Sequence, residues 1–285
     1  MSRPQRIEFE GAYYHVMNRG RGREDIFRSP EHFDAFLGVL SDAVQRFGLV
    51  VHAYCLMTNH YHILVSTPQG NLQRAMRHIG GVYTQHYNRL QNTDGSLFKG
   101  RYKAILIDSD EYLLHLSKYI HNNPLEAKMV ESLANYRWSS YPSYIGKVKA
   151  QSWLTRAEVY DQLSGKRAKQ KHYRTYVEDQ NLSAEVSAFY SKQRFAQILG
   201  ADDFKEMIAA QHAEPSIEVP RNDRLGVKPS IEKIVAMVAQ DYNCDEASLL
   251  VVQRGRGLKN FPRKVAMYLV QRIGDCKLTE IALLQ

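Results

Sequence analysis

The order of strand-like and helix-like segments in the first 125 residues limits what this chain of 285 residues can fold into. Segments rich in β-forming or apolar residues predict strands at 12–17, 49–57, 61–65 and 104–107. Apolar residues at helical spacing predict helices from 33 to near Gly48, from 72 to about 90, and from Asp108 or Ser109 to Pro124, which is expected to end the third helix. The order βαββαβ followed by a helix predicts an α+β fold. We expect a ferredoxin-like antiparallel sheet with helices on one face.

The remainder of the chain predicts further, mainly helical parts. We place a first domain at 1–153, a helical extension and linker at 154–229, and a small helical domain at 230–285. A proline-rich stretch at 215–229 is typical of a linker between domains. An aromatic cluster is expected to cover the first domain: Tyr136, Trp138, Tyr141, Tyr144 and Trp153.

The net charge of +8 and the pI of about 9.2 favour a polyanionic partner, most simply a nucleic acid. Cys55, Cys244 and Cys276 are far apart and form no CxxC pair, which argues against a disulfide framework or a thiolate zinc site. No apolar run has the length of a membrane span, and the N-terminus lacks the apolar core of a signal peptide. We therefore expect a cytoplasmic protein without a membrane partner. The oligomeric state stays open.

A His-x-His pair, His60 and His62, stands at the start of the third predicted strand. Side chains at positions i and i+2 of a strand point to the same face. Two neutral imidazoles on one face can bind one metal ion, although such a pair in a half-buried strand can also be purely structural.

Tyr119 and Asn123 lie four residues apart on the third predicted helix and are therefore neighbours on one helical face. If this helix packs over the strand that bears the histidines, the side-chain carbonyl of Asn123 can complete an open metal site beside Tyr119. A tyrosine hydroxyl can attack a phosphate and leave a covalent phosphotyrosine. The alternative for Tyr119 is a core aromatic, because Tyr112 fits the same apolar stripe.

Two loops carry clustered positive charge that suits contacts with nucleic-acid phosphates. The cations are Arg19, Arg21 and Arg23 in the first loop and Lys99, Arg101 and Lys103 in the second. Solvated loop charge is the alternative explanation.

Four ordered blocks of sequence carry a resemblance to a known family. They are GAYYHVMNRG at 11–20, AYCLMTNHYHIL at 53–64, LFKGRYKA at 97–104 and YIHNNP at 119–124. With these blocks, residues from about 3 to 153 resemble the transposase domain of HUH single-strand tyrosine transposases, in the branch associated with repetitive extragenic palindromes.

This resemblance implies a role for each candidate residue. His60 and His62 match the metal histidines of the family, Tyr119 its nucleophile, and Asn123 a polar ligand that is often glutamine in the wider family. The implied activity is that of a single-strand DNA endonuclease and strand transferase. It would use Mg²⁺ or Mn²⁺ and a 5′-phosphotyrosine intermediate, with hairpin or palindromic-repeat DNA as the partner.

The C-terminal part has a second resemblance, to the DNA-binding domain of the bacterial replication initiator. It is carried by RGRG at 254–257, by RKVAMYL at 263–269, and by LTEIA at 278–282 as the helix before a turn. The turn and recognition helix expected after it are not present before Gln285. The resemblance implies contacts of Arg254 and Arg256 with duplex DNA. A helical packing unit without DNA binding is the alternative.

Two other functions compete with the transposase. A histidine-dependent phosphodiesterase would need further catalytic histidines near the pair, but Leu64 occupies the next alternate position after His62. A non-enzymatic DNA-binding regulator derived from a transposase would have no need of the set His60, His62, Tyr119 and Asn123.

Overall fold

The computed structural model describes residues 7–165, 167–179, 184–191, 198–211, 230–250 and 260–273. Contacts divide the chain into two compact units, residues 6–207 and residues 208–285 with 1–5. The first unit contains β1 (Ala12–Arg19), η1 (Arg21–Arg23), α1 (Pro30–Phe47), β2 (Val50–Met57), β3 (His60–Thr67), α2 (Leu72–Gln91), β4 (Lys103–Ile107), α3 (Ser109–Glu126), η2 (Leu133–Asn135), α4 (Tyr141–Tyr144), α5 (Ala157–Asp161), α6 (Lys169–Glu178), α7 (Ala184–Ser191) and β5 (Ile198–Leu199). Helix α8 (Asp202–Gln211) crosses the boundary, and the second unit contains α9 (Ile231–Asp241), α10 (Glu246–Leu250) and α11 (Phe261–Ile273).

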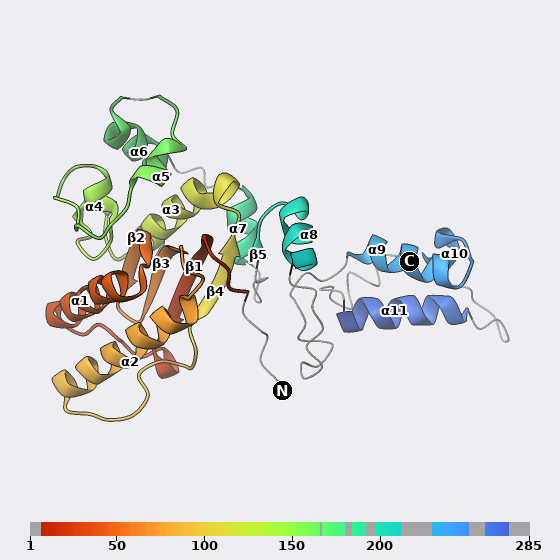
Figure 1. Cartoon of the computed structure of the whole chain (residues 1–285), viewed down its shortest axis with the longest axis horizontal. Helices are drawn as coiled ribbons and strands as arrows, with labels where there is room; N and C mark the ends of the chain where they lie inside the picture. Colours follow the sequence, from red (N-terminus) through yellow and green to blue (C-terminus); the bar gives the residue numbers. More distant parts are fainter. Residues whose placement is uncertain are drawn as a thin grey trace. The chain divides into compact units, whose positions relative to one another are not determined.

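The five strands form one sheet in the order β2-β3-β1-β4-β5 (Figure 1). The first four are antiparallel neighbours, which confirms the α+β prediction with its ferredoxin-like order. The short strand β5 was not predicted, and it pairs with β4 in parallel through Leu106 and Ile107. A two-residue strand has too little pattern to be found from sequence.

The hairpin between β2 and β3 turns at Thr58 and Asn59, as predicted. The carbonyl of Thr58 accepts hydrogen bonds from the backbone N–H groups of Ile26 and Phe27, both 2.9 Å long. The segment before α1 therefore fixes the turn, and with it the position at which β3 begins.

Helices cover both faces of the sheet, so the expectation of helices on one face was wrong. Tyr61 of β3 packs against Phe36 of α1, with 4.9 Å between ring centroids, and Phe36 packs against Tyr83 of α2. His62, the next residue, points to the opposite face and meets Tyr119 of α3. Helix α3 and the segments after it cover the polar side chains on that second face. Because burial of polar groups without partners is costly, these segments must also supply hydrogen-bond partners.

Pro124 does not end α3, contrary to the prediction, since the helix continues to Glu126. A proline at this position cannot donate to the carbonyl of Ile120, four residues earlier. The side-chain amide of Asn123 donates to that carbonyl instead, at 3.4 Å, and to the carbonyl of Tyr119 at 2.9 Å. This side chain therefore replaces the missing backbone hydrogen bond.

The aromatic cluster after α3 packs on the first domain, as predicted, and the structure adds that it contacts β2. The Tyr136 hydroxyl donates to the carbonyl of Leu56, and that of Tyr144 donates to the carbonyl of His52, each at 2.6 Å. Trp153 packs near Tyr54. These long-range contacts fix the outer edge of the sheet.

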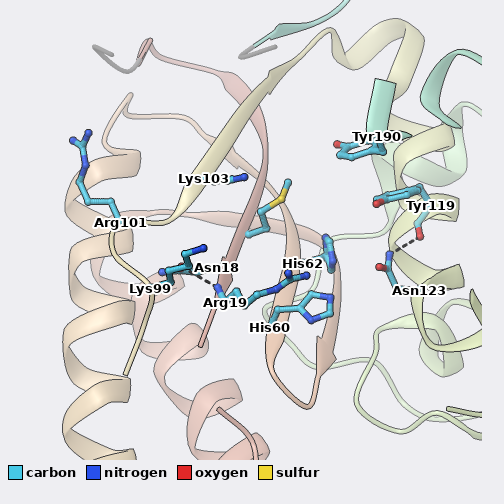
Figure 2. Close-up of a pocket in the computed structure, with 11 residues that line it drawn as sticks. Asn18, Arg19, His60, His62, Lys99, Arg101, Lys103, Tyr119, Asn123 and Tyr190 are labelled. Carbon is cyan, nitrogen blue, oxygen red and sulfur yellow. Dashed lines mark hydrogen bonds between the residues drawn. The ribbon is translucent and has the colours of Figure 1, made fainter. Parts of the chain in front are cut away.

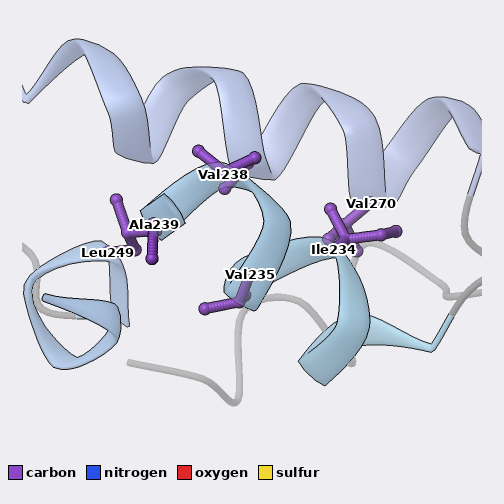
Figure 3. Packing of buried hydrophobic residues seen from close by; sticks show 7 residues of the cluster. Ile234, Val235, Val238, Ala239, Leu249 and Val270 are labelled. Atoms are coloured by element: carbon purple, nitrogen blue, oxygen red, sulfur yellow. The ribbon is translucent and has the colours of Figure 1, made fainter. Parts of the chain in front are cut away.

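The second unit has a small apolar core of its own (Figure 3). Side chains at helical spacing on α9 face α11 and α10, and the core is made by Ile234, Val235, Val238, Ala239, Leu249, Ala266 and Val270. This agrees with the predicted helical C-terminal part. The predicted linker at 215–229 and the segments 254–257 and 278–282 lie outside the described residues. The domain boundaries at 153 and 229 stay predictions.

Among the helices that the structure describes, none combines the length and the apolar character needed to cross a membrane.

Candidate active site

Strand β3 places His60 and His62 on the face of the sheet that α3 covers. Their ring centroids are 5.0 Å apart and the rings are nearly perpendicular. In the antiparallel register His60 lies opposite Arg19 of β1, and His62 lies opposite Met17. The pair therefore stands at the end of β1 from which the first basic loop begins (Figure 2).

Both histidines are neutral at neutral pH. Burial, followed by the charge of Arg19, lowers the pKa of His60 to about 4. Burial, together with His15, His60 and Arg19, lowers the pKa of His62 well below its ordinary value. A neutral imidazole is the form that ligates a metal ion.

Each of these histidines has a ring nitrogen that can act as a ligand. His60 Nδ1 lies 2.6 Å from Oδ1 of Asn59, which can only accept, so Nδ1 carries the hydrogen and Nε2 keeps a lone pair. His62 Nε2 is buried without a hydrogen-bond partner among the described residues. This nitrogen is therefore available to a ligand or an ion.

Tyr119 of α3 faces the two histidines. Its ring lies edge-on to that of His62, with centroids 6.1 Å apart. Burial, and then the charge of Glu126, raises the pKa of Tyr119 to about 12, so the hydroxyl is protonated at neutral pH.

Asn123 follows one turn later on the same helical face. Its Nδ2 donates to backbone carbonyls of α3, which leaves Oδ1 as the free acceptor end of the amide. Figure 2 shows Asn123 below Tyr119, on the side of the helix that faces His60. The neighbouring Asn122 donates to the carbonyls of Lys118 and Val177 and is not part of the cavity lining.

These side chains line one cavity with a volume of about 500 Å³. Its lining consists of Met17, Asn18, Arg19, His60, His62, Lys99, Arg101, Lys103, Tyr119, Asn123 and Tyr190. The predicted metal and nucleophile candidates are thus together with four of the predicted basic residues. Among the described residues, no group of three or more His, Cys, Asp or Glu side chains is arranged to hold a metal ion, so a complete site would need the Asn123 amide or a non-protein ligand.

The two basic loops are joined through their backbones. The N–H of Lys99 donates to the carbonyl of Arg19, and that of Arg21 donates to the carbonyl of Leu97, each at 2.9 Å. This pairing brings cations from two distant parts of the sequence to the same cavity. We call these lining residues, Arg19, Lys99, Arg101 and Lys103, the basic rim. Arg21 and Arg23 are exposed on η1 and are not part of the cavity lining, whereas Arg254 and Arg256 lie outside the described residues.

Two residues of this site were not singled out from the sequence. His15 of β1 is fully buried, and its ring stacks on that of His62 with centroids 5.1 Å apart. His15 stands two residues before Met17 on the same predicted strand, so both side chains point to one face. That spacing could have placed His15 on the face that bears the histidine pair. Tyr190 of α7 stacks on Tyr119, with centroids 4.2 Å apart and an interplanar angle of 12°. No local pattern in the sequence links Tyr190 to this site.

A comparison with known families gives a match for part of the chain. Residues 8–123 match the model of the family described as IS200-like transposases. This part of the chain is therefore similar to IS200-like transposases. It covers β1 to β4 and α3 as far as Asn123, and therefore both histidines and Tyr119, but it does not reach α7.

Solved structures show more distant likenesses. A REP-associated tyrosine transposase bound to a REP hairpin shares 15% identity at a TM-score of 0.46, over 55% of this chain and 98% of that chain. A crystal structure of a transposase candidate from Deinococcus radiodurans R1 shares 20% identity at a TM-score of 0.31, over 43% of this chain and 97% of that chain. The comparison with curated proteins found no match.

Proposed function

We propose that this protein is a metal-dependent single-strand DNA endonuclease and strand transferase that acts as a transposase at hairpin or palindromic repeats. The observation that carries the proposal is the shared cavity of His60, His62, Tyr119 and Asn123, with its basic rim. The IS200-like family match of residues 8–123 supports the transposase class. The sequence resemblance to the palindrome-associated branch supports the choice of DNA.

The residues present fit a divalent cation, Mg²⁺ or Mn²⁺. His60 and His62 would hold it through Nε2, and Asn123 would hold it through Oδ1. The fit rests on the buried, unpartnered Nε2 of His62 and on the Asn123 amide, whose nitrogen is already engaged by α3. When bound, the cation would polarise a DNA phosphate and offset the charge that develops on it.

The protein side chains would carry out the transfer as follows. Arg19, Lys99 and Lys103 bind phosphates of the strand and orient it. The Tyr119 oxygen attacks phosphorus and loses its proton, while the bond from phosphorus to the 3′ oxygen breaks and that oxygen gains a proton. The product is a 5′-phosphotyrosine and a free 3′-OH. Attack by another DNA 3′-OH reverses the exchange and joins strands, because the phosphotyrosine bond conserves the energy.

The proposal also specifies single-stranded DNA. Tyr119 is half-buried between α3, α7 and the sheet, so the phosphate must enter the cavity to reach it. A flexible single strand beside a hairpin can bend its backbone into such a cavity more easily than a stiff, fully paired duplex.

The test is incubation of the full chain with end-labelled hairpin oligonucleotides and Mn²⁺, followed by denaturing electrophoresis. We expect a covalent protein–DNA band with the single strand, and little or none with the same oligonucleotide annealed to its complement. EDTA, His60→Ala and His62→Ala should each remove the band. His78→Ala is a matched control, because His78 lies on α2 and pairs with Asp42.

Three outcomes would contradict the proposal. Equal cleavage of the single strand and the duplex would refute the single-strand assignment. An undiminished band in EDTA would refute the metal role of the histidines. Binding of the hairpin without any covalent band under all of these conditions would favour the DNA-binding regulator instead.

A further inference from the structure

A chain of hydrogen bonds leads from α7 through β1 to His62. The Tyr190 hydroxyl lies 2.5 Å from Nδ1 of His15, and Nε2 of His15 lies 2.9 Å from Nδ1 of His62. His15 is completely buried, and both of its ring nitrogens are engaged. Two residues from separate elements, Tyr190 and His15, therefore act on His62, a cavity-lining histidine whose other ring nitrogen has no hydrogen-bond partner among the described residues.

The neutral rings give this chain a direction. A neutral imidazole has one N–H, so only two proton arrangements satisfy both contacts. In the first, His62 Nδ1 donates to His15, His15 Nδ1 donates to the Tyr190 oxygen, and His62 Nε2 keeps its lone pair. In the second, all donors are reversed and His62 Nε2 carries a buried hydrogen without a partner. Orphaned buried N–H groups are rarer in proteins than orphaned acceptors, which favours the first arrangement.

Tyr190 also contacts the nucleophile. Its ring stacks on that of Tyr119 at 4.2 Å, while His15 and His62 meet the Tyr119 ring edge-on at 6.0 and 6.1 Å. Figure 2 shows Tyr190 directly above Tyr119. One side chain of α7 is thus in contact with both the Tyr119 ring and the histidine chain.

We propose that His15 and Tyr190 are positioning residues, which hold His62 as the Nδ1–H tautomer with Nε2 open to the cavity and hold the Tyr119 ring against the histidines. The proposal rests on the proposed function for its purpose, but the His62 tautomer can be measured without DNA. Groups that fix a ligating histidine through its second nitrogen commonly matter to metal sites. Here that support comes in part from Tyr190, which lies outside the segment matched by the family.

The direct test is long-range ¹H–¹⁵N NMR of the histidine rings in the metal-free full chain, which distinguishes Nδ1–H from Nε2–H. The His62 signals are identified by their loss in His62→Gln. We expect Nδ1–H in the unmodified protein and a shift towards Nε2–H in His15→Phe. In Tyr190→Phe, which keeps the ring and removes the hydroxyl, we expect a partial shift.

Controls separate positioning from general damage to the fold. His32→Phe removes another buried histidine with two hydrogen-bond partners, Ser29 and Gln91, and should leave the His62 tautomer unchanged. Tyr160→Phe removes a half-buried tyrosine hydroxyl that donates to the carbonyl of Tyr144, and serves as the match for Tyr190→Phe. If His15→Phe fails to fold, Tyr190→Phe still tests the chain.

A second readout is Mn²⁺ affinity, measured from the electron paramagnetic resonance signal of the free ion. We expect His15→Phe to weaken binding about 10- to 100-fold, and Tyr190→Phe to weaken it less. Tyr190→Leu, which removes the stacking ring, should also slow adduct formation at saturating Mn²⁺.

The outcomes of the two proposals can be told apart. An unchanged His62 tautomer and unchanged Mn²⁺ affinity in both His15→Phe and Tyr190→Phe would overturn the positioning inference, even if the unmodified protein cleaves DNA. A tautomer that depends on His15, in a protein that forms no DNA adduct, would uphold the positioning and refute the nuclease.

Discussion

The two faces of the central sheet are built from different chemistry. On the face covered by α1 and α2, aromatic rings such as Phe36, Tyr61 and Tyr83 pack into a closed apolar core. On the face covered by α3 and the segments after it, the buried side chains include His15 and His62. Alternate residues of the same strands thus serve two purposes, stability on one side and reactive groups on the other.

The polar face remains stable because most of its buried groups have partners. Both ring nitrogens of His121 on α3 are engaged, with the Tyr173 hydroxyl at 2.7 Å and Ser140 Oγ at 2.6 Å. His52 Nε2 lies 3.0 Å from Ser66 Oγ, while its Nδ1 has no partner among the described residues. Buried polar groups with partners cost little, whereas unpartnered ones are costly. Substitutions on the apolar face should therefore change stability, and substitutions around the cavity should change chemistry.

The largest expected effect separates the two faces most clearly. Tyr119→Phe removes only the hydroxyl of the proposed nucleophile and keeps the ring in its stack with Tyr190. We expect adduct formation to fall about 10⁴-fold or more, as for the loss of a catalytic nucleophile, with hairpin binding retained. Single-turnover adduct assays and urea unfolding measure the two properties. Tyr112→Phe, on the same helix but outside the cavity lining, is the control, and an undiminished adduct in Tyr119→Phe would exclude this nucleophile.

On the apolar face we expect the reverse pattern. Phe36→Ala deletes a ring that is fully buried between β3 and α2, which should lower the free energy of unfolding by about 3–5 kcal/mol. The activity per folded molecule should be retained. Urea unfolding followed by tryptophan fluorescence reports on this unit, because Trp138 and Trp153 both lie in it. Leu90→Ala, in the same unit and at a residue that is 45% exposed, should change stability far less. A large loss of specific activity in Phe36→Ala would contradict the expectation that the apolar face affects stability but not activity.

The basic rim should show a smaller effect, on binding alone. Lys99→Ala removes one exposed cation of the cavity lining. We expect weaker hairpin binding and a slope of log affinity against log salt that is reduced by about 1, since one fewer counterion is released. Fluorescence anisotropy at several salt concentrations measures this slope. Lys171→Ala, at an exposed residue of α6, is the control. Equal slopes for both variants would show that Lys99 does not contact DNA phosphates.

The smallest expected effect concerns acid stability on the polar face, away from the cavity. Burial lowers the pKa of His52, although the neighbouring Glu158 opposes the shift. Below the unfolded pKa near 6.5 the unfolded chain binds a proton that the folded protein does not, so stability is lost as the pH falls through that range. His52 should contribute at most about 1.4 kcal/mol per pH unit.

Urea unfolding between pH 7.5 and 5 compares the unmodified protein with His52→Gln, which can keep a bond to Ser66. The variant should show the shallower dependence on pH. Tyr13, which stacks on His52 and donates to Glu158, belongs to the same group, so Tyr13→Phe serves as a check on the coupling. Identical pH dependence in all three proteins would show that folding does not lower the pKa of His52.

The sequence by itself determined the features that depend on local geometry. The period of two along a strand placed His60 and His62 on one face, and the period of 3.6 along a helix placed Tyr119 above Asn123. The order of apolar segments predicted β1 to β4 and α1 to α3, because each segment had enough residues to show its period. The end of α3 was predicted wrongly, because the Asn123 amide donates to the Ile120 carbonyl in place of the N–H that Pro124 lacks. Helix propensities do not describe such a side-chain hydrogen bond.

Only the tertiary structure decided which distant residues complete the cavity. His15 lies 47 positions from His62, and Tyr190 lies 175 positions from His15, yet all three form one hydrogen-bond chain. The two basic loops meet because the backbone of residues 97–99 pairs with that of 19–21, a contact that neither loop encodes alone. The physical reason is that a periodic pattern fixes the direction of a side chain relative to its own element. The partner that it meets is set by how the elements pack, through contacts between residues far apart in the chain.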